Sequence, residues 1–243
     1  MGKLKFIKNK KVVLSSFLLF LTAVISAILI ISTPVTALIS VTNSNGAIYK
    51  GNENGNKVAL TFNVYENAKN VEKILDILST EKQKATFFIG GCWADDNLET
   101  VSKIVSAGHE IGSHGYYHKD HAKLTLEENK REIEYNHKLI LNGVGVKMNL
   151  FAPPSGSFSK NTVKACENLG YRVIMWTTDT IDWRDHNEDL IVKRALKNLS
   201  AGNIILMHPT DCTVTALTKI IKGITEKSLI ADTVSAVIEG ENF

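Results

Sequence analysis

Cysteine and proline are scarce in this 243-residue sequence, and both shortages exclude classes of protein. The three cysteines (Cys92, Cys166 and Cys212) are too few for a disulfide-stapled scaffold, and their spacing matches no zinc finger. Four prolines and 16 glycines exclude a collagen-like or linker-dominated chain. Hydrophobic residues make up 44% and charged residues 22%, which excludes wholesale disorder and suits one globular domain, alone or with an appendage.

Acidic residues are absent from the first eleven positions, and this gap explains the positive net charge. The basic residues found there are Lys3, Lys5, Lys8, Lys10 and Lys11. Removing these five charges from the formal total of +3 leaves −2 for the rest of the chain. The positive charge is therefore a feature of the N-terminus, and we expect no nucleic-acid partner.

An uncharged apolar run follows these lysines, from Val12 to Ser32. A helix needs roughly 20 such residues to cross the hydrocarbon core, and lysines on the N-terminal side predict an inside N-terminus and an exported body. A cleaved signal peptide, with Val35 and Ala37 before the cut, is the alternative. The expected parts are a cytoplasmic basic tail (1–11), a transmembrane anchor or signal peptide (12–32), a polar linker (33–56) and a folded domain (57–243).

Beyond residue 57, short apolar runs alternate with longer amphipathic segments. The expected strands are Val58–Phe62, Ala85–Ile89, Glu110–Ser113, Leu150–Ala152, Arg172–Thr177, Asn203–Met207 and Thr233–Val237. The expected helices, with apolar residues at three- or four-residue spacing, are Val71–Glu81, Leu98–Ala107, Leu126–Leu141, Lys160–Leu169, Leu190–Leu199 and Val214–Glu226. This alternation predicts an α/β fold with a parallel sheet, more specifically an incomplete (β/α) barrel of about seven strands.

Histidines gather directly after the expected strands, where (β/α) barrels carry their chemistry. His114 and His118 follow Glu110–Ser113 and are four residues apart, so a helical turn or tight loop can direct both imidazoles at one metal ion. A pair of ordinary surface histidines is the alternative. His121 extends the series, and we expect it to be solvated, with a supplementary ligand role as the alternative.

His208 ends the apolar strand Asn203–Met207, and Asp182 follows Arg172–Thr177. An imidazole at a barrel mouth can donate a proton, and a carboxylate can orient it, whereas a satisfied core histidine and a loop acid are the alternatives. Trp183 either packs or forms a wall for a small apolar group of a substrate.

Two nucleophilic mechanisms find no support in the sequence. Ser155 lies in Pro-Ser-Gly rather than in Gly-x-Ser-x-Gly, so we expect no serine hydrolase. Cys92 has no base paired with it and is expected to be buried or inert.

The ordered set of motifs resembles the polysaccharide deacetylases of carbohydrate esterase family 4, which share the NodB-homology domain. Residues 179–183 (DTIDW) match the family motif Asp-x-x-Asp-Trp, and residues 206–208 (LMH) match Leu-x-His. Residues 114–118 (HGYYH) and 152–156 (APPSG) are similar to His-Ser/Thr-x-x-His and Arg-Pro-Pro-Tyr-Gly. Residues 61–64 (TFNV) correspond to Thr-Phe-Asp-Asp. The resemblance extends over almost the whole expected domain and implies an incomplete (β/α) barrel.

The resemblance also implies a role for each matching residue. Family members use a divalent metal, commonly zinc, to polarise an acetamide carbonyl and a water molecule. The metal-binding histidines correspond to His114 and His118, and the proton donor corresponds to His208, tuned by Asp182. The implied substrate-binding residues are Pro154, Ser155, Gly156 and Trp183.

Three positions depart from the family pattern. The metal-binding aspartate corresponds to Val64, the catalytic base to Asn63, and an arginine that tethers the base to Ala152. An arginine beside a neutral asparagine would be an unpaired buried charge, which is costly, so the joint loss of base and arginine indicates a coherent variant site. The general-acid residues, His208 and Asp182, are retained and form the acid side of the site. The base side, at positions 63 and 64, has lost its general base and its metal-binding aspartate.

Two functions follow from the resemblance. The first is metal-dependent hydrolysis of N-acetyl groups from an N-acetylated polysaccharide such as peptidoglycan or chitin, with Asp120, His121, Glu66 or water completing a weak zinc site. The second is a catalytically silent, glycan-binding or morphogenetic pseudoenzyme on the same fold. Both place the domain outside the cytoplasm, anchored to the membrane or secreted after signal cleavage, and neither predicts a protein partner.

Overall fold

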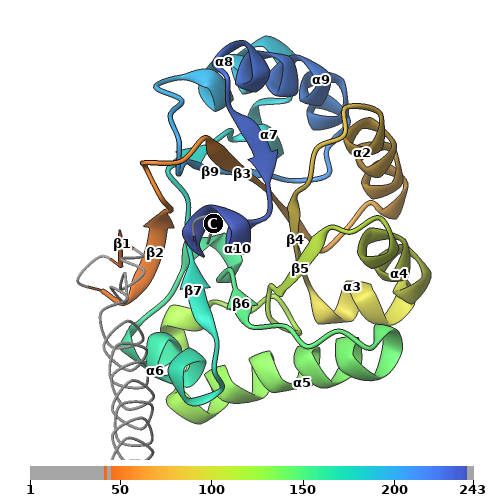
Figure 1. Ribbon diagram of the computed structural model, residues 1–243. Coiled ribbons are helices and arrows are strands. Elements are labelled where there is room, and N and C mark those ends of the chain that lie inside the picture. The colour runs from red at the N-terminus through yellow and green to blue at the C-terminus, as the bar shows by residue number, and fades with distance from the viewer. Residues whose placement is uncertain (1–40, 43–44, 240–243) are drawn as a thin grey trace, which may run out of the picture. The chain divides into compact units, whose positions relative to one another are not determined.

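Strands and helices alternate in the computed structural model, which describes residues 41–42 and 45–239 (Figure 1). The strands are β1 (Val41–Thr42), β2 (Ala47–Lys50), β3 (Lys57–Val64), β4 (Thr86–Ile89), β5 (Glu110–Ser113), β6 (Leu150–Phe151), β7 (Arg172–Ile174), β8 (Thr178–Asp179), β9 (Ile204–Met207) and β10 (Ile230–Asp232). The helices are α2 (Ala68–Thr80), α3 (Gly91–Asp96), α4 (Leu98–Ser106), α5 (Leu126–Val144), α6 (Lys160–Asn168), α7 (Asp182–Asp185), α8 (Glu188–Leu196), α9 (Asp211–Glu226) and α10 (Val234–Glu239).

The segments expected to form a basic tail and a membrane anchor (1–11 and 12–32) lie outside the described residues. Among residues 41–42 and 45–239, no helix has both the length and the apolar character needed to span a bilayer.

The strands form one sheet in the order β1-β2-β7-β6-β5-β4-β3-β9-β8, with β10 paired to β3. Every strand pair from β2 to β8 along this order is parallel. The two end strands of the order, β1 and β8, are not paired with each other, so the barrel is incomplete, as the sequence predicts. Lys50, the last residue of β2, forms an isolated antiparallel bridge with Asn203, immediately before β9.

Several stretches differ from the sequence-based expectation: β1, β8, β10, α3 and α7 were not expected, and two further segments form other structure than expected. Ala47–Lys50 lies in the expected linker but forms β2, which pairs with β7 because Ala47 and Ile48 can be buried there. Thr233–Val237 was expected to be a strand, and this prediction is wrong. Most of this segment belongs to α10, since the Thr233 hydroxyl accepts a hydrogen bond from the backbone amide of Ala236 and caps the helix.

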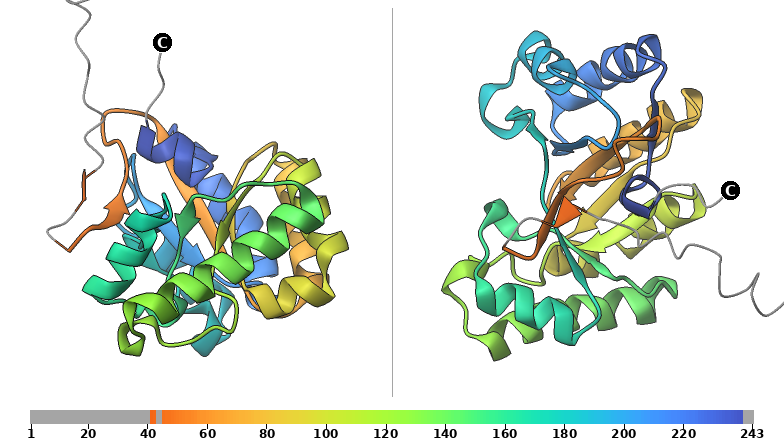
Figure 2. Two further views of the ribbon diagram at one scale, coloured as in Figure 1. Left: turned by 90° about the horizontal axis from the view of Figure 1, so that it is seen from below. Right: turned by 60° about the vertical axis from the view of Figure 1, so that its left-hand side comes forward.

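The alternation of side chains along the strands separates two apolar cores. Outward-facing residues, such as Leu60 and Phe62 of β3, pack beneath the outer helices. Inward-facing residues, such as Ala59, pack against α10, which contributes Val234 and Val237 to the barrel interior. Helix α10 follows β10, and β10 pairs with the first residues of β3, so this helix fills the amino-terminal end of the barrel (Figures 1 and 2). The carboxyl ends of the strands remain open for a site.

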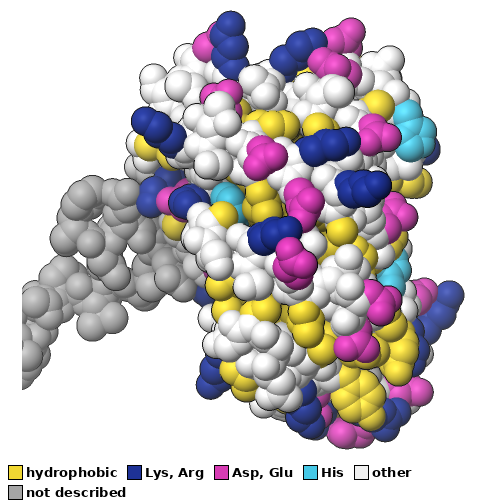
Figure 3. Space-filling view, turned by 90° about the vertical axis from the view of Figure 1, so that its right-hand side faces the viewer, with side chains coloured by type: hydrophobic (Ala, Val, Ile, Leu, Met, Phe, Trp, Pro, Cys, Tyr) yellow, Lys and Arg dark blue, Asp and Glu magenta, His cyan; other side chains and the backbone are white. Residues whose placement is uncertain are grey.

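The outer helices present a mixed-charge surface (Figure 3). On the face shown there, acidic and basic side chains alternate over the helices at the right of Figure 1. Lys103 of α4, for example, pairs with Glu72 of α2 at 2.8 Å and with Glu99 at 2.9 Å. Exposed pairs of this kind contribute little to stability, and this face contains no single-sign patch that would attract a polyanion.

Candidate active site

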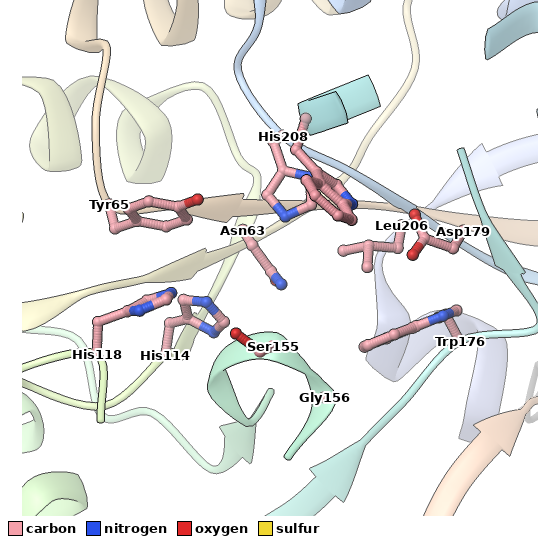
Figure 4. A pocket seen from close by; sticks show the side chains of 11 residues that line it. Asn63, Tyr65, His114, His118, Ser155, Gly156, Trp176, Asp179, Leu206 and His208 are labelled. Atoms are coloured by element: carbon pink, nitrogen blue, oxygen red, sulfur yellow. The ribbon is translucent and has the colours of Figure 1, made fainter. Parts of the chain in front are cut away.

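A pocket opens at the carboxyl ends of the strands (Figure 4). Its cavity of about 380 Å³ falls in the size range of small-ligand sites. The residues that line it are Asn63, Tyr65, His114, His118, Ser155, Gly156, Trp176, Asp179, Trp183, Leu206 and His208. The structure therefore brings together residues from all five matched motifs, which lie far apart in the sequence.

His114 is held rigidly in this pocket. Its ring is buried, and Nδ1 lies 2.8 Å from the carbonyl oxygen of Ala152. Because a carbonyl can only accept a hydrogen bond, Nδ1 carries the proton and Nε2 keeps its lone pair. Burial, followed by the neighbouring His118, lowers the pKa of His114 to about 3, so the imidazole is neutral near pH 7.

His118 lies in the same pocket and packs against an aromatic ring. The ring centroid of Tyr65 is 4.3 Å from that of His118, 6.1 Å from that of His114 and 6.4 Å from that of His208. Tyr65 thus lies among the three histidines (Figure 4). Burial and the charges of Glu66 and Asp182 raise the pKa of its phenol, which stays protonated at neutral pH.

Helix α5 supports the loop between His114 and His118. The buried carboxylate of Glu132 accepts hydrogen bonds from the backbone amides of Tyr116 at 3.0 Å and Tyr117 at 2.8 Å. Asn136, one turn further along, donates to the carbonyl oxygen of Gly115 at 3.1 Å. Sequence reasoning missed both side chains, although two polar residues on the apolar face of an amphipathic helix were an available signal.

Asp182 and His208 form the pair expected on the acid side. Nδ1 of His208 lies 2.8 Å from Oδ1 of Asp182, and the backbone amide of His208 donates to Oδ2 at 2.6 Å. The hydroxyl of Thr213 and the backbone amide of Trp183 also donate to this fully buried carboxylate, at 2.5 and 2.9 Å. The carboxylate fixes the imidazole through Nδ1 and leaves Nε2 available to a ligand.

The opposite side lacks ionisable groups at the substituted positions. Asn63 lines the pocket, but its buried Oδ1 has no hydrogen-bond partner. Val64 is fully buried in the outer core, because consecutive side chains of a strand face opposite ways. Ala152 is buried inside the barrel, in the cluster against which Trp176 packs.

The turn after β6 forms one wall of the pocket. Ser155 and Gly156 line it with φ angles of 55° and 66°. Glycine is required at 156, because a Cβ there would lie 2.6 Å from the ring of Trp176. Pro154 is buried at the start of this turn and is not among the lining residues, and its predicted substrate contact stays a prediction. Trp183 does line the pocket and is 51% exposed, so its predicted role as a wall stays open to test.

The acidic candidates for a replacement metal ligand lie elsewhere. Asp120 accepts a hydrogen bond from the Ser157 hydroxyl at 2.5 Å and pairs with Lys123 at 3.0 Å on the surface. Glu66 is exposed and does not line the pocket.

His121 is buried, which corrects the expectation that it is solvated. Its Nδ1 lies 2.7 Å from Oδ1 of Asn129, and its ring packs on Phe151 at a centroid distance of 4.8 Å. Its backbone carbonyl accepts from the Thr162 hydroxyl at 3.1 Å. These contacts draw the residue under the loop, and it does not line the pocket.

The donor set does not fit a resident zinc ion. Catalytic zinc sites take three protein ligands. Of the three family ligand positions, His114 and His118 carry a donor, whereas Val64 is apolar and faces away from the pocket. Within residues 41–42 and 45–239, no group of three histidine, cysteine or acidic side chains is placed to hold a metal ion.

Four lining residues were missed by the sequence reasoning: Tyr65, Trp176, Asp179 and Leu206. Asp179 and Leu206 belong to matched motifs, so assigning every motif position would have found them. Trp176 comes two residues after Ile174, which faces the barrel interior, so strand periodicity indicated its direction.

Cys92 does not line the pocket and is exposed on α3, so its expected inertness does not come from burial.

Comparisons with known proteins agree with this arrangement. A family model for polysaccharide deacetylase matches residues 50–174. A Bacillus subtilis (strain 168) relative, "Uncharacterized protein YlxY", is 38% identical over 192 residues, which are 79% of this chain and 60% of that protein. A peptidoglycan-N-acetylglucosamine deacetylase of Bacillus cereus is 32% identical over 184 residues, which are 74% of this chain and 67% of the enzyme.

A solved structure shows the same likeness. The wild-type form of a Bacillus anthracis pseudoenzyme of the CE4 family has a TM-score of 0.77 and 35% identity, covering 80% of this chain and 69% of that one. A mutant of that pseudoenzyme is described as having restored enzymatic activity. Because the family model matches about half of the chain and its relatives include both deacetylases and a pseudoenzyme, this chain belongs to the polysaccharide deacetylase family, carbohydrate esterase family 4.

Proposed function

We propose that this chain is a non-hydrolytic member of its family that binds cell-wall glycan in the pocket. The observation that carries the proposal is the unequal pocket, in which Asp182 and His208 form a complete pair while Asn63 and Val64 occupy the base and metal-ligand positions. A neutral amide takes no proton from water at neutral pH, and losing a general base costs about 10²–10⁴-fold in rate.

The remaining lining suits binding. Tyr65, Trp176 and Trp183 offer large apolar faces to a sugar ring, while the side chains of His208 and Asp179 offer polar contacts at the same opening. A pocket with a few polar groups among aromatic walls can orient a glycan unit without any chemical step.

The relatives support the substrate class of the proposal, and the sequence supports its location. The Bacillus cereus relative is a peptidoglycan deacetylase, and the Bacillus anthracis relative is a pseudoenzyme, so we assign peptidoglycan or a similar amino-sugar glycan as the ligand. We also propose that residues 12–32 anchor the domain outside the cytoplasmic membrane, because this run is uncharged and follows five lysines.

The second candidate is slow metal-dependent hydrolysis of N-acetyl groups. The intact contact of His208 with Asp182, at 2.8 Å, favours it, since this pair would protonate a leaving amine. In that case His114 and His118 would hold the divalent metal weakly.

Acetate release separates the two candidates. The full chain is incubated with peptidoglycan and with N-acetylated chitooligosaccharide, with and without added zinc, and its binding to insoluble peptidoglycan is measured in parallel. We expect binding without acetate release above background. Release by the wild type that disappears in His208→Ala would overturn the proposal in favour of slow hydrolysis.

Restoring the missing groups tests the cause of inactivity. The triple variant Asn63→Asp, Val64→Asp, Ala152→Arg supplies the base, a carboxylate at the metal-ligand position and the tethering arginine. Because Val64 faces the outer core, we expect zinc binding and measurable acetate release once the new carboxylate turns into the pocket at the end of β3. Asn63→Asp alone is the matched control, because it supplies a base without a third ligand. A triple variant that is folded by circular dichroism and binds zinc, yet releases no acetate, would contradict this assignment.

A further inference from the structure

The side chains that line the pocket include a negative charge but no lysine or arginine to balance it. The carboxylate of Asp179 lines it, and its lining residues include neither lysine nor arginine. Oδ1 of Asp179 accepts a hydrogen bond from the backbone amide of Ile181 at 2.8 Å. Arg184 lies near enough for Asp179 to affect its pKa, but its guanidinium pairs with Asp185 at 2.6 Å.

A second carboxylate lies behind the pocket. Besides His208, the groups that donate to Asp182 are the Thr213 hydroxyl and the backbone amide of Trp183, both of them neutral. Two arginines lie nearby, Arg184 and Arg194, and both pair with the carboxylate of Asp185 rather than entering the lining. The Asp179 carboxylate is therefore the charged carboxylate in the lining itself, and it favours a positively charged ligand.

Aromatic rings complete a site for a cation. Tyr65 and Trp176 line the same opening as Asp179, and ring faces attract ammonium groups. The third ring of the lining, Trp183, already has the Arg184 guanidinium 5.9 Å from its centroid. The amide of Asn63 adds a group whose oxygen has no partner, and a half-turn of this amide presents that acceptor to the pocket.

The same features disfavour an acetamide. A carbonyl oxygen is stabilised by positive charge, which a metal ion supplies in metal-dependent hydrolysis. Here the third ligand position is Val64, facing the outer core, and the arginine position is Ala152, buried inside the barrel. Both of these positions are apolar, so neither opposes the carbonyl oxygen or repels an ammonium group. The Arg184 guanidinium lies 5.9 Å from the Trp183 ring centroid, but it pairs with Asp185 and is not among the lining residues.

We propose that the pocket selects the free amine of a de-N-acetylated amino sugar, a glucosamine unit, over the N-acetylated form. This inference rests on the proposed non-hydrolytic glycan binding and names its ligand. The reaction that must supply the ligand is N-deacetylation of the glycan. The chain then recognises the product of the chemistry that its active relatives perform.

Binding of two matched tetrasaccharides tests the inference. The full chain, purified in mild detergent, is titrated calorimetrically with tetraglucosamine and with tetra-N-acetylchitotetraose at a pH where the amine is protonated. We expect tetraglucosamine to bind about tenfold more tightly, the effect of one charge-assisted contact. Asp179→Asn keeps the oxygen that accepts from Ile181 and should remove most of this difference. The matched control is Asp189→Asn, which removes an equal charge at a 94% exposed side chain of α8 and should leave the difference unchanged.

The outcomes separate this inference from the proposed function. Equal affinities, or preference for the acetylated tetramer, would overturn the inference while glycan binding stands. A preference for tetraglucosamine that persists in Asp179→Asn would also overturn it, since the attraction would then lie outside the pocket. Failure of the wild type to bind either tetramer or peptidoglycan would overturn the proposed function and the inference with it. The wild-type comparison depends on no variant, so it decides even if Asp179→Asn does not fold.

Discussion

The two halves of the pocket differ in how firmly their polar groups are held. On the acid side, four hydrogen bonds converge on the Asp182 carboxylate from His208, Thr213 and Trp183. On the base side, Oδ1 of Asn63 is buried without a partner, and Val64 makes apolar contacts only. A buried carboxylate must keep its hydrogen-bond donors, because a buried charge without partners is costly. A neutral amide costs less free energy when it lacks a hydrogen-bond partner. The acid half is therefore part of the fold, and the base half is free to change.

Removing the acid-side carboxylate should have the largest effect. Asp182→Ala strands the Thr213 hydroxyl and two backbone amides in a fully buried site, so we expect a loss of about 3–5 kcal/mol in the free energy of unfolding. Urea unfolding measures it, and Asp182→Asn, which keeps one acceptor oxygen, should lose less. A loss below about 1 kcal/mol for the alanine variant would remove the structural difference between the halves.

Acid should destabilise the protein through two buried histidines. Burial lowers the pKa of His114 to about 3 and that of His109 to about 4, so the unfolded chain takes up their protons first as the pH falls. Stability is then complete above about pH 6.5 and decreases below it, by about 4 kcal/mol in total at pH 5. Urea unfolding at the two pH values measures the change.

His109 supplies the control for this pH dependence. It lies outside the pocket, with its ring 5.5 Å from that of Phe87, so His109→Gln should remove about half of the acid effect without changing the site. A stability profile that stays flat from pH 7 to pH 5 would show that neither histidine is neutral and buried as described.

The wall of the pocket that the turn after β6 forms should be sensitive to the addition of a single methyl group. Gly156→Ala brings a Cβ within 2.6 Å of the Trp176 ring at a φ of +66°, and we expect a loss of about 1–3 kcal/mol. Its neighbour Ser155 is the matched comparison, because Ser155→Gly relieves a φ of +55° and should be neutral or stabilising by up to about 1 kcal/mol. Thermal unfolding measures both, and equal losses would show that Trp176 does not approach this turn closely.

The base side should tolerate the loss of its amide best of all. Asn63→Ala removes an oxygen that has no partner, so we expect a change in the free energy of unfolding within about 0.5 kcal/mol. The difference in the free energy of unfolding between Asn63→Ala and Asp182→Ala should therefore be the largest among these variants. A loss of more than about 2 kcal/mol would mean that Asn63 is held as firmly as the acid-side carboxylate.

Sequence patterns were most informative where a local rule applied. The apolar spacing of Leu126–Val144 and its capping box at Thr125 and Glu128 belong to one continuous segment, so its helix could be predicted. The motif histidines could be placed in one pocket because parallel strands bring their carboxyl ends together. Patterns failed for Ala47–Lys50, whose strand exists because β7 offers it an edge, and for His121, whose burial depends on Asn129 and Thr162.

The sequence by itself determined the alternation of the main strands and helices, the family, and which catalytic residue types are present or replaced, because each of these follows from local periodicity or from motif spacing. Only the tertiary structure decided that Val64 faces the outer core, that Tyr65 lies among three histidines and that Asp179 shares an opening with Trp176 and Trp183. The physical reason is that side-chain direction at a strand end and charge balance in a pocket depend on neighbours from distant parts of the chain, which no local pattern records.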